Sequence, residues 1–555
     1  MLQVHNLTVK FLSGKVENEV VKKISFDLKE NKILGIVGES GSGKSVTSLS
    51  VLGLLPKNTI QEGDIFFDEK NLLKISDKEF QQIRGNKIAM IFQEPMSSLN
   101  PTLTCGSQVA EVLKQHTGLN KKEMYEEVIS LFQKVKLPLP DRIFNSYPHQ
   151  ISGGQKQRVM IAIAIACKPD LLIADEPTTA LDVTVQKEII LLLKELQKEN
   201  KMSILLISHD LSLVSEIADD VIILFKGQIV EKGNTTDIFH SPQHDYTKGL
   251  INSKPNLNQR LKKLPTVGDF IKNRIFTDVY SKKERDAYHS KIYGLKPLLE
   301  IVDVKKYFNT SDGFTKKPLI KAVDKVSFKL YEGETLGLVG ESGCGKTTLG
   351  RSIMQLEKVT SGKIFYKGKD ITHLSKTALQ NLRKEIQIIF QDPFSSLNPR
   401  ISIGNAILEP MNVHGVLSNY KERKIYVIEL LKKVGLEEDH FNKYPHEFSG
   451  GQRQRIGIAR AIALKPKIII CDESVSALDV SVQAQVLNLL NELKSTFNFS
   501  YIFISHDLSV VKYMSDQLVV MNKGKIEEID DADTIYKTPK SEYTKNLIDA
   551  IPKGV

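Results

Sequence analysis

The octapeptide GESGSGKS at residues 38–45 returns as GESGCGKT at residues 340–347. Each copy follows a short apolar run and precedes a stretch compatible with a helix, which is the context a phosphate-binding loop needs. The glycines let backbone N–H groups turn inward around phosphates, and the helix N-terminus adds partial positive charge. A single copy could be a glycine turn that only links a strand to a helix, but two copies in matching context predict two nucleotide sites. The loop residues assigned to nucleotide binding are Gly38, Glu39, Ser40, Gly41, Ser42, Gly43, Lys44, Ser45, Gly340, Glu341, Ser342, Gly343, Cys344, Gly345, Lys346 and Thr347.

Other motifs follow each loop at a nearly fixed offset. The offset is 297 residues between Ser152 and Ser449, between Glu176 and Glu473, and between His209 and His506. It is 302 at the loop lysines and 298 at Gln93 and Gln391, so small insertions fall in the front of each unit. A period near 300 residues indicates a duplicated domain. We predict an α/β fold with a first domain at 1–253, a linker at 254–297 and a second domain at 298–555.

Pairs of acids end two strand-length apolar runs, LLIADE at residues 171–176 and IIICDE at residues 468–473. Such strands are buried in parallel sheets, and ligands gather at their carboxyl ends. Paired acids at a strand end can also simply open a loop. Behind a phosphate loop we predict that Asp175 and Asp472 hold Mg²⁺, together with the hydroxyls of Ser45 and Thr347. Glu176 and Glu473 are predicted to polarise the attacking water.

Glutamines and histidines end further apolar runs. Gln93 and Gln391 can reach both Mg²⁺ and water, and can move when a neighbouring subunit moves. A lone glutamine would more often be a core or surface residue, and only the repeat favours the functional interpretation. His209 and His506 are predicted to bond a γ-phosphate oxygen and to sense its loss, although a lone histidine there is usually a satisfied core residue.

Residues 104–147 have a helical period, which predicts a helical subdomain inserted in the α/β core. It ends in YPHQISGGQKQR, matched by YPHEFSGGQRQR in the second half. Each serine is placed as a helix N-cap, and the two glycines allow close approach of an anion. Ser-Gly-Gly alone is usually a turn, whereas the longer motif before a long helix is specific. The residues assigned to nucleotide binding here are Ser152, Gly153, Gly154, Gln155, Ser449, Gly450, Gly451 and Gln452.

Composition sets limits on the class of protein. The chain has 555 residues, of which 41% are hydrophobic and 26% charged, as in soluble globular proteins. No apolar run approaches the ~20 residues of a membrane-spanning helix, so we expect a cytoplasmic chain unless a partner holds it at a membrane. The four cysteines have no metal-ligand spacing, so no zinc site or disulfide framework is predicted. Cys344 lies at a helix N-terminus, which predicts a lowered pKa for its thiol.

The predicted linker is basic. The chain carries a net charge of +10, and residues 254–297 contain eleven Lys or Arg and four Asp or Glu. Three prolines and the lack of a sustained apolar period favour a linker. It could touch nucleic acid, or an anionic leaflet at ~1 kcal/mol per nearby charge, or be a solvated tether.

These motifs together resemble those of the ABC-type ATPases, over nearly the whole chain apart from the linker. More narrowly, the turns EPMSSLNP and DPFSSLNP, the stretches LDVTVQ and LDVSVQ, and the terminal YTKGL and YTKNL resemble the oligopeptide/dipeptide/nickel importer family. The first half resembles fused ATPases of microcin C-type peptide importers, and the second resembles oligopeptide-permease ATPases. The departures are small: Ile151 and Phe448 replace a leucine, and Ser474 replaces a proline.

The resemblance implies two tandem P-loop ABC domains, each with a RecA-like α/β core, an antiparallel β subdomain and the helical insertion. It implies ATP as ligand, Mg²⁺ as cofactor, and nucleotide contacts for Phe11 and Phe308. Such domains pair head to tail, so Ser449 would complete the site of Lys44, and Ser152 that of Lys346. The implied partners are two integral-membrane permease subunits and an extracytoplasmic solute-binding protein, which places the chain at the cytoplasmic face of the membrane. The linker holds no cysteine, so we predict no iron–sulfur cluster there.

A second class of function shares these catalytic motifs. Ribosome-associated tandem ABC proteins are basic and reach RNA through a long charged helical hairpin between their domains, whereas this linker is short and broken by prolines. A DNA-repair ABC ATPase would need a long coiled-coil insertion and zinc-ligand cysteines. The sequence therefore favours an ATP-hydrolysing subunit of a peptide importer, with no specific nucleic acid partner expected.

Overall fold

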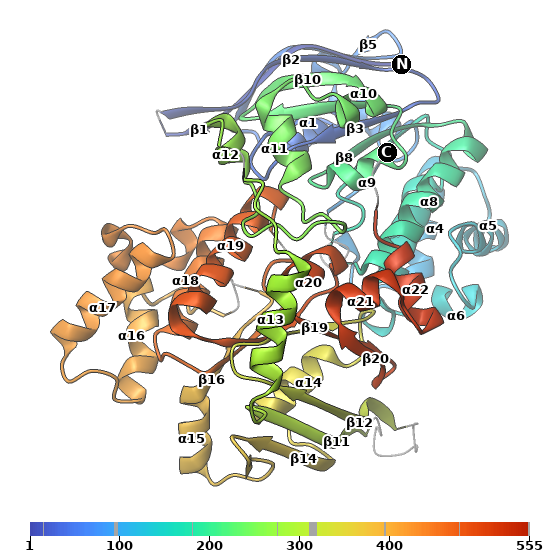
Figure 1. Ribbon diagram of the computed structural model, residues 1–555. Helices are drawn as coiled ribbons and strands as arrows, with labels where there is room; N and C mark the ends of the chain where they lie inside the picture. The colour runs from blue at the N-terminus through green and yellow to red at the C-terminus, as the bar shows by residue number, and fades with distance from the viewer. Residues whose placement is uncertain are drawn as a thin grey trace.

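A computed structural model describes residues 1–14, 16–93, 98–179, 181–274, 276–309, 319–392, 396–476 and 478–552. The two repeats fold as two α/β units, joined by the light green segment that carries α13 (Figure 1). Each unit has a mostly parallel sheet, an antiparallel sheet and an inserted group of helices. The predicted fold class is confirmed.

In the first half the antiparallel sheet has the order β2-β1-β4-β5, and the mostly parallel sheet has the order β10-β9-β3-β8-β7-β6. The strands are β1 Leu2–Ser13, β2 Val16–Leu28, β3 Ile33–Val37, β4 Thr59–Phe67, β5 Lys70–Asn71, β6 Ile88–Ile91, β7 Leu171–Asp175, β8 Ser203–Ser208, β9 Asp220–Phe225 and β10 Gln228–Asn234. The helices are α1 Lys44–Val51, α2 Asp77–Ile83, α4 Cys105–His116, α5 Lys121–Lys134, α6 Pro140–Phe144, α7 Gly153–Ile165, α8 Val183–Asn200, α9 Leu211–Ser215, α10 Thr235–His240 and α11 Asp245–Asn252.

The second half repeats both sheets, in the orders β12-β11-β14-β15 and β16-β17-β18-β13-β19-β20. The strands are β11 Leu299–Phe308, β12 Ile320–Leu330, β13 Thr335–Val339, β14 Ser361–Tyr366, β15 Lys369–Asp370, β16 Ile386–Ile389, β17 Ile468–Asp472, β18 Ser500–Ile504, β19 Gln517–Asn522 and β20 Lys525–Asp531. The helices are α14 Lys346–Ile353, α15 Lys376–Glu385, α16 Ile403–Val413, α17 Tyr420–Lys433, α18 Gly450–Ile462, α19 Val480–Phe497, α20 Leu508–Met514, α21 Ala532–Lys537 and α22 Glu542–Asp549.

Burial explains the central strands. Every residue of β3, β7 and β8 is buried, and the three strands run parallel with β6 beside them. Strands covered on both faces must be apolar throughout, so polar residues can follow only where a strand ends. Because parallel strands end at one edge, the residues that follow β3, β6, β7 and β8 meet there.

The inserted helices confirm the predicted helical subdomain. Thr104 caps α4, and Asn120 caps α5 in a reciprocal capping box with Glu123. In the second half α16 and α17 pack in the same way, and α16 lies against the 3-10 turn Glu438–Asn442.

The two halves touch through reciprocal contacts. The Lys187 ammonium group on α8 donates to the Asp549 carbonyl at the end of α22, at 2.7 Å, and Figure 1 shows α22 lying near α8. In the opposite sense, α11 of the first half lies against α19 of the second half. The C-terminal helix of each half thus contacts the long helix that follows the acid pair of the other half.

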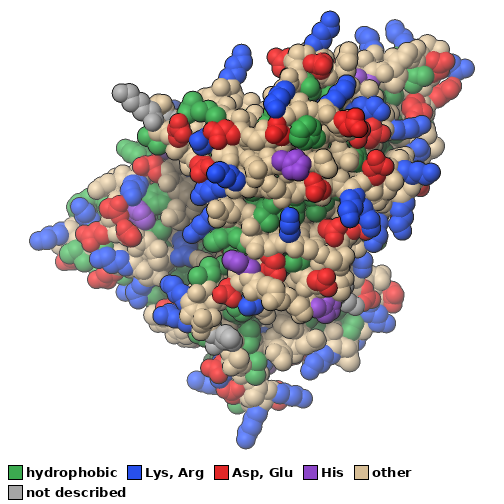
Figure 2. Space-filling view, turned by 90° about the horizontal axis from the view of Figure 1, so that it is seen from above, with side chains coloured by type: hydrophobic (Ala, Val, Ile, Leu, Met, Phe, Trp, Pro, Cys, Tyr) green, Lys and Arg blue, Asp and Glu red, His purple; other side chains and the backbone are tan. Residues whose placement is uncertain are grey.

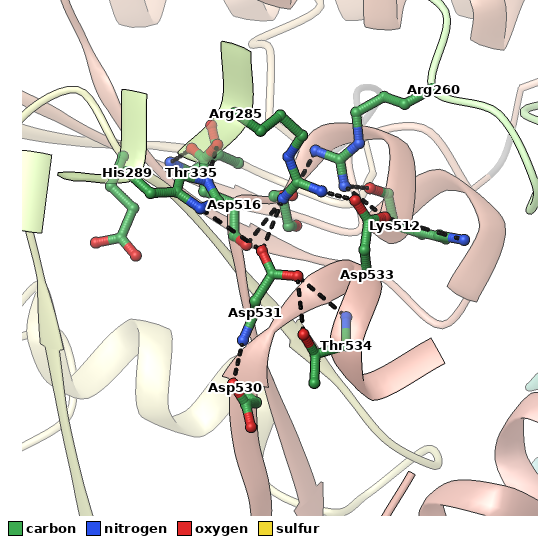
Figure 3. A network of polar contacts seen from close by, with 12 residues as sticks. Arg260, Arg285, His289, Thr335, Lys512, Asp516, Asp530, Asp531, Asp533 and Thr534 are labelled. Carbon is green, nitrogen blue, oxygen red and sulfur yellow. Dashed lines mark hydrogen bonds and ion pairs between the residues drawn. The ribbon is translucent and has the colours of Figure 1, made fainter. Parts of the chain in front are cut away.

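Residues 254–297 are docked on the protein. They contain α12 Val267–Ile271 and α13 Lys282–Tyr293. On α13, Arg285 pairs with Asp531 at 2.9 Å and also with Asp533, and the His289 ring lies 3.4 Å from Asp516 (Figure 3). Arg260 donates to the carbonyls of Ser515 and Lys512. The domain boundaries remain a proposal, but two arginines of this segment, Arg260 and Arg285, pair with acids of the second half.

The same segment enters both hydrophobic cores. Leu264 is 1% exposed in the core of the second half, and its backbone exchanges hydrogen bonds with the Asn488 side chain, 2.9 and 2.8 Å. Val267, three residues on, is 5% exposed in the core of the first half. Gly249 of α11 is required there, since a Cβ would lie 2.8 Å from Val267 Cα. The segment therefore fastens the two halves to each other.

Charges of both signs cover the surface. On the face shown in Figure 2, Lys and Arg side chains are interspersed with Asp and Glu. A nucleic-acid site would gather cations on one face or stripe. The excess positive charge is therefore not concentrated on this face. Among the described residues there is no helix long and apolar enough to cross a membrane.

A pair of glycine substitutions tests the packing of the helical insertion. A Cβ at Gly404 on α16 would lie 2.3 Å from the Phe441 ring, so Gly404→Ala should lower the free energy of unfolding by about 1–3 kcal/mol. At Gly457 on α18, no described atom beyond its own helix lies within 4 Å of an added Cβ, so Gly457→Ala should raise the free energy of unfolding by about 0.5–1 kcal/mol. Thermal unfolding of the two variants should shift the midpoint in opposite directions. Equal midpoints would show that Phe441 is free to move away.

Candidate functional site

The two phosphate loops have the same shape. Gly41, Gly43, Gly343 and Gly345 have φ values of +76°, +103°, +78° and +108°, a region that favours glycine. Close approach matters just before them, because a Cβ at Gly38 would lie 2.2 Å from the Leu224 carbonyl oxygen. The loops therefore expose backbone N–H groups in a cradle that side chains would fill.

The loop lysines are held in their own loops. Lys44 is 5% exposed and donates to the carbonyls of Gly38 and Glu39 at 2.8 and 2.9 Å. Lys346 does the same with Gly340 and Glu341, at 2.7 and 2.9 Å. Burial lowers the pKa of Lys44, although the nearby acids Glu176 and Asp479 oppose this effect. A phosphate could replace the two carbonyls as acceptor.

The predicted metal ligands lie together in both halves. The Ser45 hydroxyl donates to Asp175 Oδ1 at 3.2 Å, and the Thr347 hydroxyl to Asp472 Oδ1 at 2.9 Å. Burial raises the pKa of Asp175 to about 6, and the neighbouring Glu176 adds to this rise. A hydroxyl and a carboxylate within hydrogen-bonding distance offer the oxygen atoms that Mg²⁺ prefers.

The second acid of each pair joins the strand-end glutamine and histidine. Gln93 donates its amide to Glu176 at 2.9 Å, and His209 Nδ1 lies 3.3 Å from the same carboxylate. The second half repeats this cluster with Gln391, Glu473 and His506, at 2.8 and 3.3 Å. Three separate strands thus bring a glutamine, a glutamate and a histidine to one point in each half.

Electrostatics keep these glutamates charged. Burial alone would raise the pKa of Glu176, but the His209 hydrogen bond and the charges of His209 and Lys44 lower it to about 2. The pKa of Glu473 is lowered in the same way by His506 and Lys346. A glutamate that is ionised at neutral pH can accept a proton from water.

The two glutamates also share an unusual backbone. Their φ values are +48° and +47°, in the left-handed region that is uncommon for residues other than glycine. Each backbone N–H donates across the sheet, from Glu176 to Ile207 and from Glu473 to Ile504, both at 2.9 Å. Such strain persists only where surrounding contacts hold it, and it collects at functional sites.

The signature serines begin helices, as predicted. Ser152 caps α7 in a capping box with Gln155, and Ser449 caps α18 with Gln452. The second glycine of each motif allows close packing, since a Cβ at Gly154 or Gly451 would lie 2.9 or 2.5 Å from a valine of the following long helix. Ser152 exchanges hydrogen bonds with Gln155, and Ser449 with Gln452, within these helix starts.

Each phosphate loop faces the other half of the chain. Glu39 of the first loop lies beside Ser481 and Asp479: burial raises its pKa, and a hydrogen bond from Ser481 opposes the rise. Glu341 of the second loop lies near Asp182 and Glu188, which raise its pKa together with burial. A cavity of about 210 Å³ is lined by Leu181 and Asp182 from the first half and by the second loop, Gln391, Glu473 and His506. The contacts are therefore head to tail.

Two tyrosines support the phosphate loops, and no role is predicted for them from the sequence. The Tyr246 hydroxyl accepts a hydrogen bond from the Glu39 backbone N–H at 3.0 Å, and Tyr543 accepts one from Glu341 at the same distance. The signal available was their repeat at the 297-residue offset within YTKGL and YTKNL. Thr179, which donates to Glu176 at 2.9 Å, was also missed.

One prediction about the loops is wrong. The Cys344 thiol was expected to have a lowered pKa because it lies at a helix N-terminus. It is 5% exposed, and this burial raises its pKa above the ordinary value even though the Lys346 ammonium lies 3.7 Å from the sulfur. Removal of the thiolate from water outweighs one nearby cation.

Two further predicted features are the phenylalanines Phe11 and Phe308 and the turns that follow the strand-end glutamines. Phe11 lies on β1 and packs against the core of the first antiparallel sheet, and Phe308 ends β11 with Lys306 Nζ 4.7 Å from its ring centroid. Parts of the EPMSSLNP and DPFSSLNP turns, residues 94–97 and 393–395, lie outside the described residues.

Comparison with known proteins shows which protein family the chain matches. It matches the ABC transporter family over residues 21–179 and 323–476, and the C-terminal region of oligopeptide/dipeptide transporters over residues 230–272. It is 44% identical to the glutathione import ATP-binding protein GsiA of Escherichia coli strain K12, over 100% of this chain and 89% of that protein. GsiA of Shigella boydii serotype 4 shows the same identity and coverage. Among solved structures, a dimeric ATP-binding cassette bound to ADP and Pi is 28% identical over 42% of this chain and 98% of its own, with a TM-score of 0.39.

The resemblance indicated by the motifs is thereby confirmed, and the ribosome-factor alternative finds no support. This chain belongs to the ABC transporter family, as a tandem member with two ATP-binding ABC ATPase domains and an oligopeptide/dipeptide transporter C-terminal region.

Proposed function

We propose that the chain hydrolyses ATP at two composite sites and thereby powers the import of peptide-like solutes. The observation that carries the proposal is the reciprocal facing of the halves, with Asp182 beside the second phosphate loop and Asp479 beside the first. Residues of the other half line the space in front of each phosphate loop. Bound ATP would then hold the halves together, and its hydrolysis would release them.

In each site the residues have separate tasks. Backbone N–H groups of the loop and Lys44 bind the phosphates, and the Ser45 hydroxyl and Asp175 carboxylate hold Mg²⁺, which neutralises phosphate charge. Glu176 accepts a proton from the attacking water, Gln93 orients that water, and His209 contacts the γ-phosphate while holding the glutamate ionised. Lys346, Thr347, Asp472, Glu473, Gln391 and His506 repeat these tasks.

The transported solute belongs to the peptide class. Support comes from the oligopeptide/dipeptide transporter region at residues 230–272 and from the relatives named as glutathione import proteins. Glutathione is itself a tripeptide, so both point to small peptides. The partners are two integral-membrane permease subunits and, through them, an extracytoplasmic solute-binding protein. The chain would act at the cytoplasmic face of the membrane, bound to the permeases.

Glu176→Gln and Glu473→Gln test the assignment of the bases. Glutamine keeps the size of the side chain but cannot accept the proton, so the double variant should lose at least about 100-fold in ATP hydrolysis. Its affinity for ATP, measured by nucleotide titration, should change by no more than about threefold. Lys44→Ala with Lys346→Ala is the matched contrast, because it should weaken nucleotide binding itself. Hydrolysis at the wild-type rate in the Glu→Gln double variant would remove both residues from the mechanism.

Ser449→Arg and its mirror image Ser152→Arg test whether the sites are composite. If the halves complete each other's sites, Ser449→Arg should lower nucleotide photolabelling of the first half on the order of tenfold, and Ser152→Arg that of the second half. Both changes remove the same helix cap, so an effect on folding would be common to the two variants. Loss of label in the half that carries the substitution would refute head-to-tail completion.

Uptake by cells tests the transport function. A strain that lacks this chain should fail to accumulate labelled glutathione or labelled di- and tripeptides, and the wild-type chain should restore uptake of at least one of them. The Glu176→Gln, Glu473→Gln double variant should not restore it. The chain should sediment with membranes only when its permease subunits are present. Co-sedimentation with ribosomes at high salt would favour the other class of tandem ABC protein.

A further inference from the structure

A small cavity lies where the two switch histidines approach the interface. It has a volume of about 80 Å³, and its lining includes His209 and Asp210 of the first half, His506 and Asp507 of the second, and Lys254. Each aspartate follows its histidine directly and caps the next helix, Asp210 at α9 and Asp507 at α20. The two switch segments thus line one cavity.

Lys254 supplies the cation in this space. Its side chain is 17% exposed, and its ammonium group donates to Asp210 Oδ2 at 3.0 Å. Burial would lower the pKa of Lys254, but the charges of Asp210, Asp507 and Glu216 raise it above its ordinary value. The ammonium group therefore stays charged. It is paired with Asp210, and Asp507 of the other half lines the same cavity. A buried charge is retained only where opposite charges compensate it.

The repeat has only one such lysine. Lys254 and Ile551 are equivalent positions, each followed by proline and each eight residues after the tyrosine that supports a phosphate loop. Ile551 lines the same cavity. Two lysines here would bring like charges together inside the interface, whereas one lysine can serve both aspartates. The lining of this cavity therefore holds one lysine, although both halves contribute an aspartate to it.

We propose that Lys254 is a positioning residue that couples the two ATP sites, by holding the switch segment of the first half, through Asp210, to that of the second half, through Asp507. The inference rests on the proposed ATPase function and goes beyond it. A path of residues then leads from one base to the other, in which Lys254 and Asp507 act on each other as charges across the shared cavity. Its members are Glu176, His209, Asp210, Lys254, Asp507, His506 and Glu473.

The path gives a physical reason for coupling. A change at Glu176 moves His209, because the imidazole lies 3.3 Å from its carboxylate. Asp210 must then shift with its helix cap, and the ammonium group that it holds also attracts Asp507. Loss of the γ-phosphate in one site would therefore change the position of the histidine in the other site. Reciprocity requires the same coupling in the other direction.

The test measures ATP hydrolysis by the full chain, bound to its permease subunits, across a range of ATP concentrations. The wild type should show a Hill coefficient above 1, which can reach about 2 for two coupled sites. Lys254→Met keeps the length of the side chain but removes its charge, and should reduce the Hill coefficient to about 1. Lys254→Arg should restore cooperativity. Lys248→Met, which removes an exposed lysine on α11 that pairs with Asp245, should leave it unchanged.

Lys254 holds Asp210, the cap of α9, so a change of Lys254 could act on α9 alone. Asp507→Asn removes the partner in the other half and leaves the Lys254–Asp210 pair in place. Asparagine still caps α20 but has no charge for Lys254. It should reduce the Hill coefficient as Lys254→Met does, and should add nothing in the Lys254→Met background. It also keeps the test decisive if Lys254→Met fails to fold. A cooperative Asp507→Asn or Lys254→Met variant, or a wild type that hydrolyses ATP without cooperativity, would overturn the coupling role. A wild type that hydrolyses no ATP would instead contradict the proposed function.

Discussion

Burial of both faces of the parallel strands is the constraint on which the site depends. β3, β7 and β8 are buried at every position, so they carry no functional side chain within their length except the acid that ends β7. Polar groups can follow only at the carboxyl edge, and there the phosphate loop, the glutamine, the acid pair and the histidine converge. The site is assembled by the sheet, which also explains why its parts are spread over about 170 residues of sequence in each half.

The sequence predicted the repeat, the helical insertion and the residues at the sheet edge, because each depends on local pattern. Glu176, Gln93 and His209 each follow an apolar run, and the parallel topology then brings them together. The repeat marks Tyr246 and Tyr543, but their contacts with the phosphate loops join residues about 200 apart, so the sequence does not show what the tyrosines contact. The pKa of Cys344 could not be predicted because its thiol lies in a hydrophobic cluster, which the sequence of the loop does not reveal.

The docking of residues 254–297 could not be predicted from the sequence either. A comparison of the two repeats explains why the segment docks on the second half rather than on the first. Three acids of the second half surround α13 and have non-acidic counterparts in the first half: Glu334, Asp531 and Asp533 correspond to Lys32, Asn234 and Thr236. A basic helix would be repelled by Lys32 and would find no carboxylate partner at Asn234 or Thr236. Charge complementarity therefore selects one of two similar grooves. Four cations of the segment, Lys254, Arg260, Lys262 and Arg285, pair with acids of this chain itself.

The same segment determines how the halves can move. Leu264 belongs to one core and Val267 to the other, so the end of the interface near α11 and α19 cannot open without removing an apolar side chain from a core, at a cost of about 1.5–3 kcal/mol. At the first phosphate loop the contact across the interface is polar, between Glu39 and Ser481, and it takes no apolar side chain out of a core. Nucleotide-driven motion is therefore easiest as a rotation about the tied end. Lys254 lies at that end, between the two switch segments, where a rotation changes distances least and a buried ion pair can persist through the cycle.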